Sequence, residues 1–93
     1  MNIIWGSDSL ADLARLHRFV ALDDPAAALQ IIENLTNAPE KLHDFPRLGE
    51  RLDVYEPREV RKLIVGRYEM RYEILPDMIF ILRIWHVRED RRG

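Results

Sequence analysis

The chain has no cysteine, which excludes disulfide bridges and thiolate metal sites. No apolar run approaches the roughly 18 residues that a membrane-spanning helix needs, and no basic-then-apolar leader precedes a small-residue cleavage site. Instead, Met1 runs directly into a segment with the character of a strand. We therefore expect a cytoplasmic protein that makes no use of a membrane.

Familiar signatures of enzymes are missing too. The sequence contains no Ser-His-Asp set, no glycine-rich phosphate loop and no side chains at metal-ligand spacing. Its acidic residues are scattered over expected helix faces or interleaved with arginine. We therefore expect no metal site and no other cofactor.

What remains has the composition of one globular domain. Ninety-three residues, 47% of them hydrophobic and 32% charged, suffice for one core, so we expect a single domain over residues 1–93. The net charge of −2 argues against a general nucleic-acid coat protein, yet residues 1–46 carry −4 and residues 47–93 carry +2. Ten of the twelve arginines lie in the second part. Arginine favours planar contacts with carboxylate or phosphate, so the basic half is the predicted contact surface; ordinary solvated charge is the alternative.

The N-terminal quarter predicts a strand and a helix. Residues 2–5 form a short apolar run closed by a glycine, which is typical of a brief strand. Ser7 or Asp8 can cap the helix that follows, because a short polar side chain can accept a bond from a free backbone N–H. Apolar side chains then recur at helical spacing as far as Leu22, with Asp12 largely outside their stripe.

A second helix and a polar segment follow. Residues 23–25, Asp-Asp-Pro, combine an aspartate cap with a proline at the first helical position. Pro39 then either kinks this helix or starts a short third one that runs through Leu42. Residues 50–59 are polar and contain Pro57, so we expect a loop or an irregular edge segment there.

The stretch 61–88 is dense in β-branched, aromatic and basic residues, and it predicts a meander of three strands. The first strand begins at Val60, and Gly66-Arg67 forms a two-residue turn with glycine first. Along residues 68–74 apolar and charged side chains alternate strictly, so the tyrosines face the core. The fold class is therefore α+β: an N-terminal strand and a two-helix hairpin packed on an antiparallel sheet, in the order β-α-α-β-β-β.

The last strand, residues 78–87, is apolar on both sides, so its orientation must come from the turn before it. Arg83 belongs on the solvent face, which predicts an odd-numbered loop, Leu75-Pro76-Asp77, and excludes a pairing of Tyr72 with Ile81. This register places Phe80, Leu82 and Ile84 in the core and pairs Glu69 with Arg83. The outer face would then collect Lys62, Ile64, Glu69, Arg71, Ile79, Ile81, Arg83 and Trp85.

Three isoleucines and a tryptophan on a solvated sheet face imply that something covers it. A helix or strand of a partner protein is one candidate. The other candidate is the chain's own segment 50–59.

Six short motifs carry a resemblance to a known family. They are Ile4-Trp5-Gly6-Ser7, Ala11-Asp12-Leu13, Phe45-Pro46-Arg47-Leu48-Gly49, Arg61-Lys62-Leu63-Ile64-Val65-Gly66-Arg67-Tyr68, Tyr72 and Ile81-Leu82-Arg83-Ile84-Trp85-His86-Val87-Arg88. In this order and spacing, the chain resembles the ParE/RelE superfamily of type II toxin–antitoxin toxins over nearly its full length.

The resemblance implies one of two activities. RelE-like members cleave mRNA on the ribosome with several Lys, Arg, His or Tyr residues, whereas ParE-like members act on DNA gyrase and lack the full nuclease set. Here Glu69 follows Tyr68 where many RelE-like nucleases have arginine, and no tyrosine follows Arg88. The chain is therefore more similar to ParE.

The resemblance to ParE implies a gyrase inhibitor that acts by binding, with a cognate antitoxin as partner in a hetero-oligomer and without a catalytic set. Its expected target-binding residues are His86, Arg88, Arg91 and Arg92. Its expected antitoxin-binding residues are Ile64, Arg71, Ile79, Ile81, Arg83 and Trp85. The first alternative is a metal-independent mRNA interferase that uses Lys62, His86 and Arg88 on the ribosome. The second is a toxin-fold interaction module without toxicity.

Overall fold

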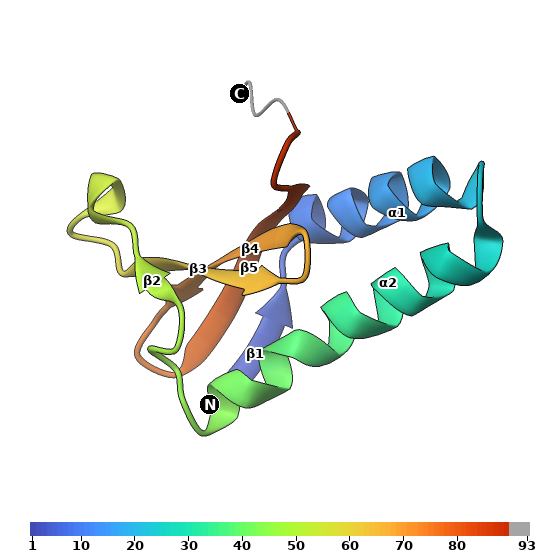
Figure 1. Ribbon diagram of the computed structural model, residues 1–93. Coiled ribbons are helices and arrows are strands. Elements are labelled where there is room, and N and C mark those ends of the chain that lie inside the picture. The colour runs from blue at the N-terminus through green and yellow to red at the C-terminus, as the bar shows by residue number, and fades with distance from the viewer. Residues whose placement is uncertain (90–93) are drawn as a thin grey trace.

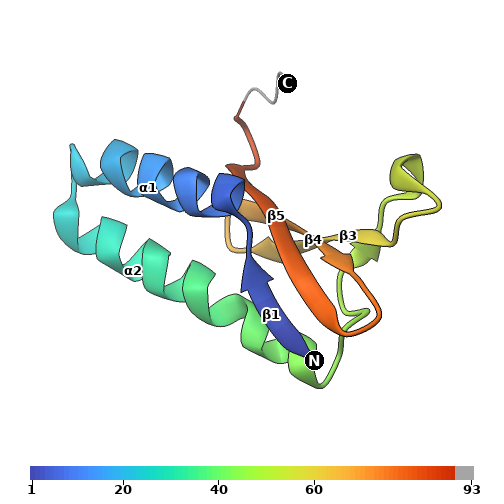
Figure 2. The same cartoon turned by 180° about the vertical axis from the view of Figure 1, so that it is seen from behind.

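A five-stranded sheet carries a helical hairpin on one face, and the hairpin extends beyond the end of the sheet (Figures 1 and 2). The computed structural model describes residues 1–89. Its elements are β1 (Asn2–Trp5), α1 (Ser7–Ala21), α2 (Pro25–Asn37), the 3-10 helix η1 (Ala38–His43), β2 (Glu50–Arg51), the 3-10 helix η2 (Asp53–Tyr55), β3 (Val60–Val65), β4 (Tyr68–Ile74) and β5 (Met78–His86). The strand order is β1-β5-β4-β3-β2, with β1 parallel to β5 and the other pairs antiparallel. The predicted α+β fold is confirmed.

The core lies between the helices and the inner face of the sheet. Its helical members are Leu16, Leu35, Ala38 and Leu42, and its sheet members are Leu63, Met70, Tyr72, Ile79, Ile81 and Ile84. Met70 and Tyr72 are fully buried, as the alternation along β4 predicts. Neither helix within residues 1–89 combines the length and the apolar character that a bilayer crossing requires.

The start of α1 differs from the prediction, because neither Ser7 nor Asp8 caps it. Gly6 occupies the cap position, and the Ser9 hydroxyl donates to its carbonyl over 2.7 Å. A Cβ at Gly6 would lie 2.7 Å from the ring of Phe80, so this tight corner between β1 and α1 requires glycine.

Two other helix signals are confirmed. Asp24 caps α2, with its side chain accepting a bond of 3.1 Å from the Ala27 N–H. After Asn37 the chain tightens into η1, with Pro39 in its first turn, so the short third helix is the correct alternative.

The β3–β4 hairpin has the predicted register, with Val65 opposite Tyr68 and Leu63 opposite Met70. Gly66 has φ +60° and no other described residue has a positive φ, which matches a glycine-first turn.

The β4–β5 register differs from the predicted one. Tyr72 lies opposite Ile81, the pairing that the three-residue loop excludes. The Leu75 N–H donates to the Met78 carbonyl over 2.8 Å, so the connection turns over residues 76–77 alone. This even-numbered turn reverses the faces expected for the first half of β5.

A bulge then restores the expected faces in the second half of β5. The register shifts next to Arg71, and Leu82 is the extra residue on β5. Beyond it, Arg83 lies opposite Arg71 and Ile84 lies opposite Met70. The orientation predicted for Arg83 and Ile84 is therefore correct, although the route to it is different.

Two isoleucines move from the outer face to the core as a result. Ile79 and Ile81 are fully buried, whereas Phe80 and Leu82, predicted for the core, are only partly buried. The cause is the two-residue turn, which a strand that is apolar on both sides does not reveal.

Candidate functional site

The three cations predicted for the outer face of the sheet each approach a carboxylate of this chain. The pairs are Lys62 with Glu50 at 3.3 Å, Arg71 with Glu69 at 2.8 Å and Arg83 with Asp12 at 2.9 Å. The predicted pairing of Glu69 with Arg83 is wrong, because Glu69 lies opposite Trp85. Each cation therefore has a negative charge beside it, which weakens its attraction for a phosphate group.

Trp85 lies between two guanidinium groups on this face. The Cζ atoms of Arg71 and Arg83 are 4.9 and 4.8 Å from the centre of its ring, at cation–π distance. The Tyr55 hydroxyl in η2 accepts a bond of 2.8 Å from Arg71. The chain's own segment 50–59 therefore covers part of this face. This agrees with the predicted alternative in which the cover comes from the same chain and not from a partner protein.

The residues predicted to bind an antitoxin separate into two groups. Ile79 and Ile81 are buried in the core by the β4–β5 register, so their assignment to a contact surface is wrong. Ile64 is 55% exposed on the outer face and remains accessible, with Arg71 and Arg83 partly buried on the same face and Trp85, at 8% exposed, buried between them.

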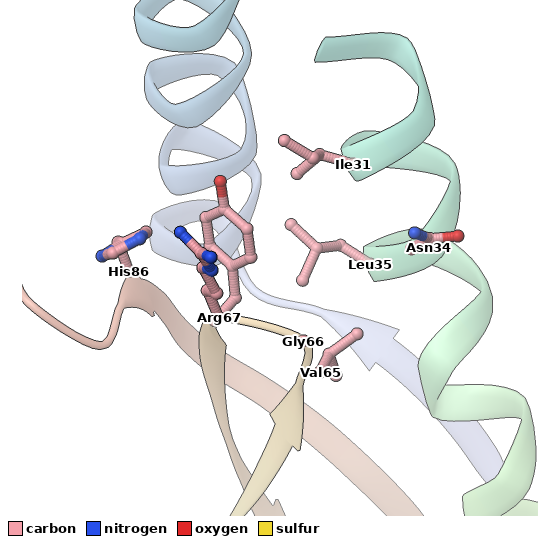
Figure 3. A pocket seen from close by; sticks show the side chains of 8 residues that line it. Ile31, Asn34, Leu35, Val65, Gly66, Arg67 and His86 are labelled. Carbon is pink, nitrogen blue, oxygen red and sulfur yellow. The ribbon is translucent and has the colours of Figure 1, made fainter. Parts of the chain in front are cut away.

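At the other end of the strands, Tyr68 and His86 form an edge-to-face pair between two cavities. Their ring centres are 5.3 Å apart, and their planes meet at 89°. A cavity of about 380 Å³ lies between this pair, α2 and the β3–β4 turn, with Ile31, Asn34 and Arg67 around it (Figure 3). Burial raises the pKa of the Tyr68 phenol, so its hydroxyl remains protonated at neutral pH.

A second cavity of about 570 Å³ lies on the α1 side of the same aromatic pair. Its apolar wall comes from Leu16, Phe19 and Val20, and its rim includes Arg15 and Arg88. Phe19 is 75% exposed, because α1 continues beyond the sheet here. We call this region, with the Tyr68–His86 pair, Arg67, Arg88 and the two cavities, the sheet end. It combines exposed apolar surface with arginine side chains.

The chain leaves β5 through a closed turn at residues 86–89. The His86 N–H donates to the Glu89 carboxylate at 3.2 Å, and the Glu89 N–H returns a bond of 2.9 Å to the His86 carbonyl. The Val87 N–H donates to the Arg67 carbonyl at 2.9 Å, and the Arg88 N–H donates to His86 Nδ1 at 3.1 Å. All four consecutive amides are thus engaged.

Asp12 and Arg15 of α1 bind this region to the helix. Asp12 is buried and accepts bonds from Arg83, from the Ile84 N–H at 2.8 Å and from Arg15 at 2.9 Å. Burial alone would raise the pKa of this carboxyl, but bonds from Arg83, the Ile84 amide and Arg15 outweigh it and hold the pKa below its ordinary value. Arg15 also pairs with Glu89.

The structure brings some of the predicted site residues together and separates others. His86 and Arg88 lie side by side at the sheet end, and Arg91 and Arg92 lie outside the described residues. Lys62 of β3 lies opposite Arg71, three residues along the strands from the Tyr68–His86 pair, and β4 lies between it and His86. Roughly 10 Å along the strands and two inter-strand spacings of about 4.8 Å each separate Lys62 from His86. Lys62 therefore does not join His86 and Arg88 in one site.

Free arginine charge also collects at the sheet end. Within residues 1–89, the side chains of Arg67 and Arg88 form no ion pair, whereas those of Arg71 and Arg83 do. The same part of the chain holds no group of three histidine or acidic side chains that could bind a metal ion. Sequence reasoning missed Asp12, Arg15 and Glu89; the position of Asp12 within a family motif was the available signal.

Comparisons with known proteins agree with this architecture. A family described as "ParE toxin of type II toxin-antitoxin system, parDE" matches residues 3–91. The chain is 29% identical to "Toxin RelE3" of Caulobacter vibrioides, over 97% of this chain and 98% of that protein. Its fold matches a chain of "Chromosomal ParDE TA system from P. aeruginosa" with TM-score 0.78 and 21% identity, covering 92% of this chain and 95% of the other. The family match spans nearly every residue, and the chain therefore belongs to the ParE toxin family of type II toxin–antitoxin systems.

Proposed function

We propose that this toxin inhibits DNA gyrase in the cytoplasm by binding it through the sheet end, with His86 and Arg88 in the contact. A type II toxin has a cognate antitoxin as partner, which would hold it inactive. The observation that carries the proposal is the distribution of unpaired charge within residues 1–89: the outer-face cations are paired with carboxylates, whereas Arg67 and Arg88 beside His86 are not. Arg91 and Arg92, which continue the basic segment, belong to the proposed contact.

The chemistry of RNA cleavage favours this proposal over the mRNA interferase. Cleavage without a metal needs a base, an acid and cations that stabilise the charge developing on the phosphate. Lys62 would have to act beside Glu50, and it is separated from His86 by roughly 10 Å along the strands and by the width of β4. The Nδ1 atom of His86 already accepts a bond from the Arg88 amide.

A binding site needs charged and apolar contact groups but no acid and base, and the sheet end offers both kinds of contact group. An arginine without an internal carboxylate can form a bidentate contact with an acidic group of a partner. The adjoining cavity, with Phe19 and Leu16 in its wall, can receive an apolar side chain. Arginine next to a desolvated apolar pocket is typical of residues that dominate binding energy.

For the antitoxin, we propose the outer face of the sheet around Ile64, with Arg71, Arg83 and Trp85. Ile64 is the most exposed apolar side chain of these strands. A segment of the antitoxin that folds on binding would cover this face, and occupancy would regulate the toxin.

Two assays test the proposed activity. Purified toxin is added to DNA gyrase in a supercoiling reaction, and in parallel to a translation reaction in which transcripts are examined for cuts. We expect inhibition of supercoiling, uncut transcripts, and at least tenfold weaker inhibition by Arg88→Ala. The matched control is Arg47→Ala, which removes an exposed arginine that pairs with Glu59 far from the sheet end. Active gyrase at excess toxin together with cut transcripts would establish the interferase instead.

A further inference from the structure

The closed turn at residues 86–89 is held from outside by one side chain, Arg15. Within the described residues, no other side chain beyond the turn bonds to the Glu89 carboxylate. One oxygen of that carboxylate binds Arg15, and the other accepts the His86 N–H. Glu89 therefore connects the helix with the first amide of the turn.

The same arginine also closes the free edge of β5. β1 pairs only with residues 78–81 of β5, so the N–H and the carbonyl of Ile84 lack a neighbouring strand on that side. The Asp12 carboxylate accepts the Ile84 N–H at 2.8 Å, and Arg15 donates to the Ile84 carbonyl at 3.2 Å. Two side chains of α1 thus continue the hydrogen bonding of the sheet to the point where the turn begins.

Asp12 and Arg15 have different structural roles. Asp12 is buried and joins α1 to β5, so its removal affects the whole fold. The Arg15 side chain is 36% exposed and lies over the turn, so its removal leaves the core packing in place. Only the planar fork of arginine can bind two carboxylates and a carbonyl at once; a lysine ammonium in its place cannot span them.

We propose that Arg15 is a positioning residue for the target-binding surface: through Glu89 it holds the turn at residues 86–89 and fixes the direction in which Arg88 leaves the sheet. The inference rests on the proposed role of Arg88 in target binding. It assigns to Arg15 a positioning role that is separate from the apolar cavity wall that Leu16 and Phe19 of the same helix provide.

We call the contacts of Arg15 and Asp12 with β5 and with Glu89 the clamp. Hydrogen exchange of the purified toxin tests whether the clamp holds the turn, without the target present. In the purified toxin, Arg15→Gln and Glu89→Gln should each speed the exchange of the Arg88 amide about tenfold, while amides in β4 stay unchanged. Arg15→Lys should behave like Arg15→Gln. The matched control is Arg18→Gln, one turn further along α1, where no ion pair is lost within the described residues. Unchanged exchange in both Arg15→Gln and Glu89→Gln would overturn the inference.

A double-mutant cycle tests the connection to binding. We expect Arg15→Gln to weaken gyrase inhibition about tenfold in the natural background and to have no further effect in an Arg88→Ala background. Equal effects in both backgrounds would overturn the positioning role. If the exchange of the Arg88 amide rises while Arg88→Ala inhibits gyrase normally, the proposed role of Arg88 fails and the clamp serves the turn alone.

Discussion

The amide of Gly49 donates to the hydroxyl of Tyr72 over 2.9 Å, although 23 residues separate them in the chain. The same hydroxyl donates to the Pro46 carbonyl at 2.8 Å. Burial raises the pKa of this phenol, so it remains protonated and able to donate at neutral pH. Tyr72 therefore secures the segment before β2, which contains the Phe-Pro-Arg-Leu-Gly motif.

Removing the Tyr72 hydroxyl should destabilise the fold. Tyr72→Phe leaves the Gly49 N–H and the Pro46 carbonyl without their partner, and we expect the free energy of unfolding to fall by about 1–3 kcal/mol. Urea denaturation measures the loss. The control is Tyr68→Phe, which removes a hydroxyl with no hydrogen bond among the described residues and should change stability by less than about 0.5 kcal/mol. Equal losses would refute the role given to the Tyr72 hydroxyl.

Asp12 should make stability depend on acid pH. Its pKa is held below the ordinary value, so its ionised form stabilises the fold above the unfolded-state pKa of about 3.9, and this stabilisation is lost as the pH falls through the folded-state value. Asp12→Asn removes the negative charge that Arg83 and Arg15 bind and leaves a neutral amide oxygen in its place, so we expect a loss of about 2 kcal/mol at pH 7.

Urea denaturation between pH 7 and pH 2 tests this dependence. The difference between the natural protein and Asp12→Asn should shrink as the pH falls below about 4. Asp23→Asn, at an exposed aspartate after α1, is the control and should leave the curve unchanged. A difference that stays constant down to pH 2 would contradict the assignment.

The elements predicted well are those with a local cause. Strict alternation along β4 and a glycine at the turn determine the β3–β4 hairpin, and Asp24 with Pro25 determines the start of α2. The β4–β5 register depends on a two-residue turn and a bulge at Leu82. An apolar strand carries no alternation that would reveal either feature, so the inference from Arg83 alone led to the wrong face for Ile79.

The candidate site divides in the same way. That His86 and Arg88 lie together was predictable, because they are near neighbours in sequence at the end of β5. The clamp was not, because Asp12 and Arg83 are 71 residues apart and Arg15 and Glu89 are 74 apart. No helical or strand period connects such pairs; they meet only because β5 extends past β1 and exposes an edge to α1.

Replacement of His86 by asparagine should affect gyrase inhibition less than replacement by glutamine. Its Nδ1 accepts the Arg88 N–H at 3.1 Å, and the oxygen of an asparagine side chain occupies a similar place. We expect His86→Asn to keep gyrase inhibition within about threefold, whereas His86→Gln loses this bond of about 1 kcal/mol and roughly fivefold in inhibition. Two equally inactive variants would instead show that the bond to the Arg88 amide is irrelevant and that His86 contributes only through its own contact with the target.

The antitoxin-binding site can be located with two substitutions that each place a glutamate on an exposed apolar position. Ile64 is 55% exposed on the outer face, and Phe19 is 75% exposed at the helical hairpin. We expect Ile64→Glu to weaken antitoxin binding at least tenfold, because a buried carboxylate would face an apolar contact, and Phe19→Glu to leave it within about twofold. Calorimetric titration with the cognate antitoxin measures both, after thermal unfolding has shown that each variant is folded. If Phe19→Glu is the damaging substitution, the antitoxin occupies the groove beside α1 and the outer face is left to the chain's own segment 50–59.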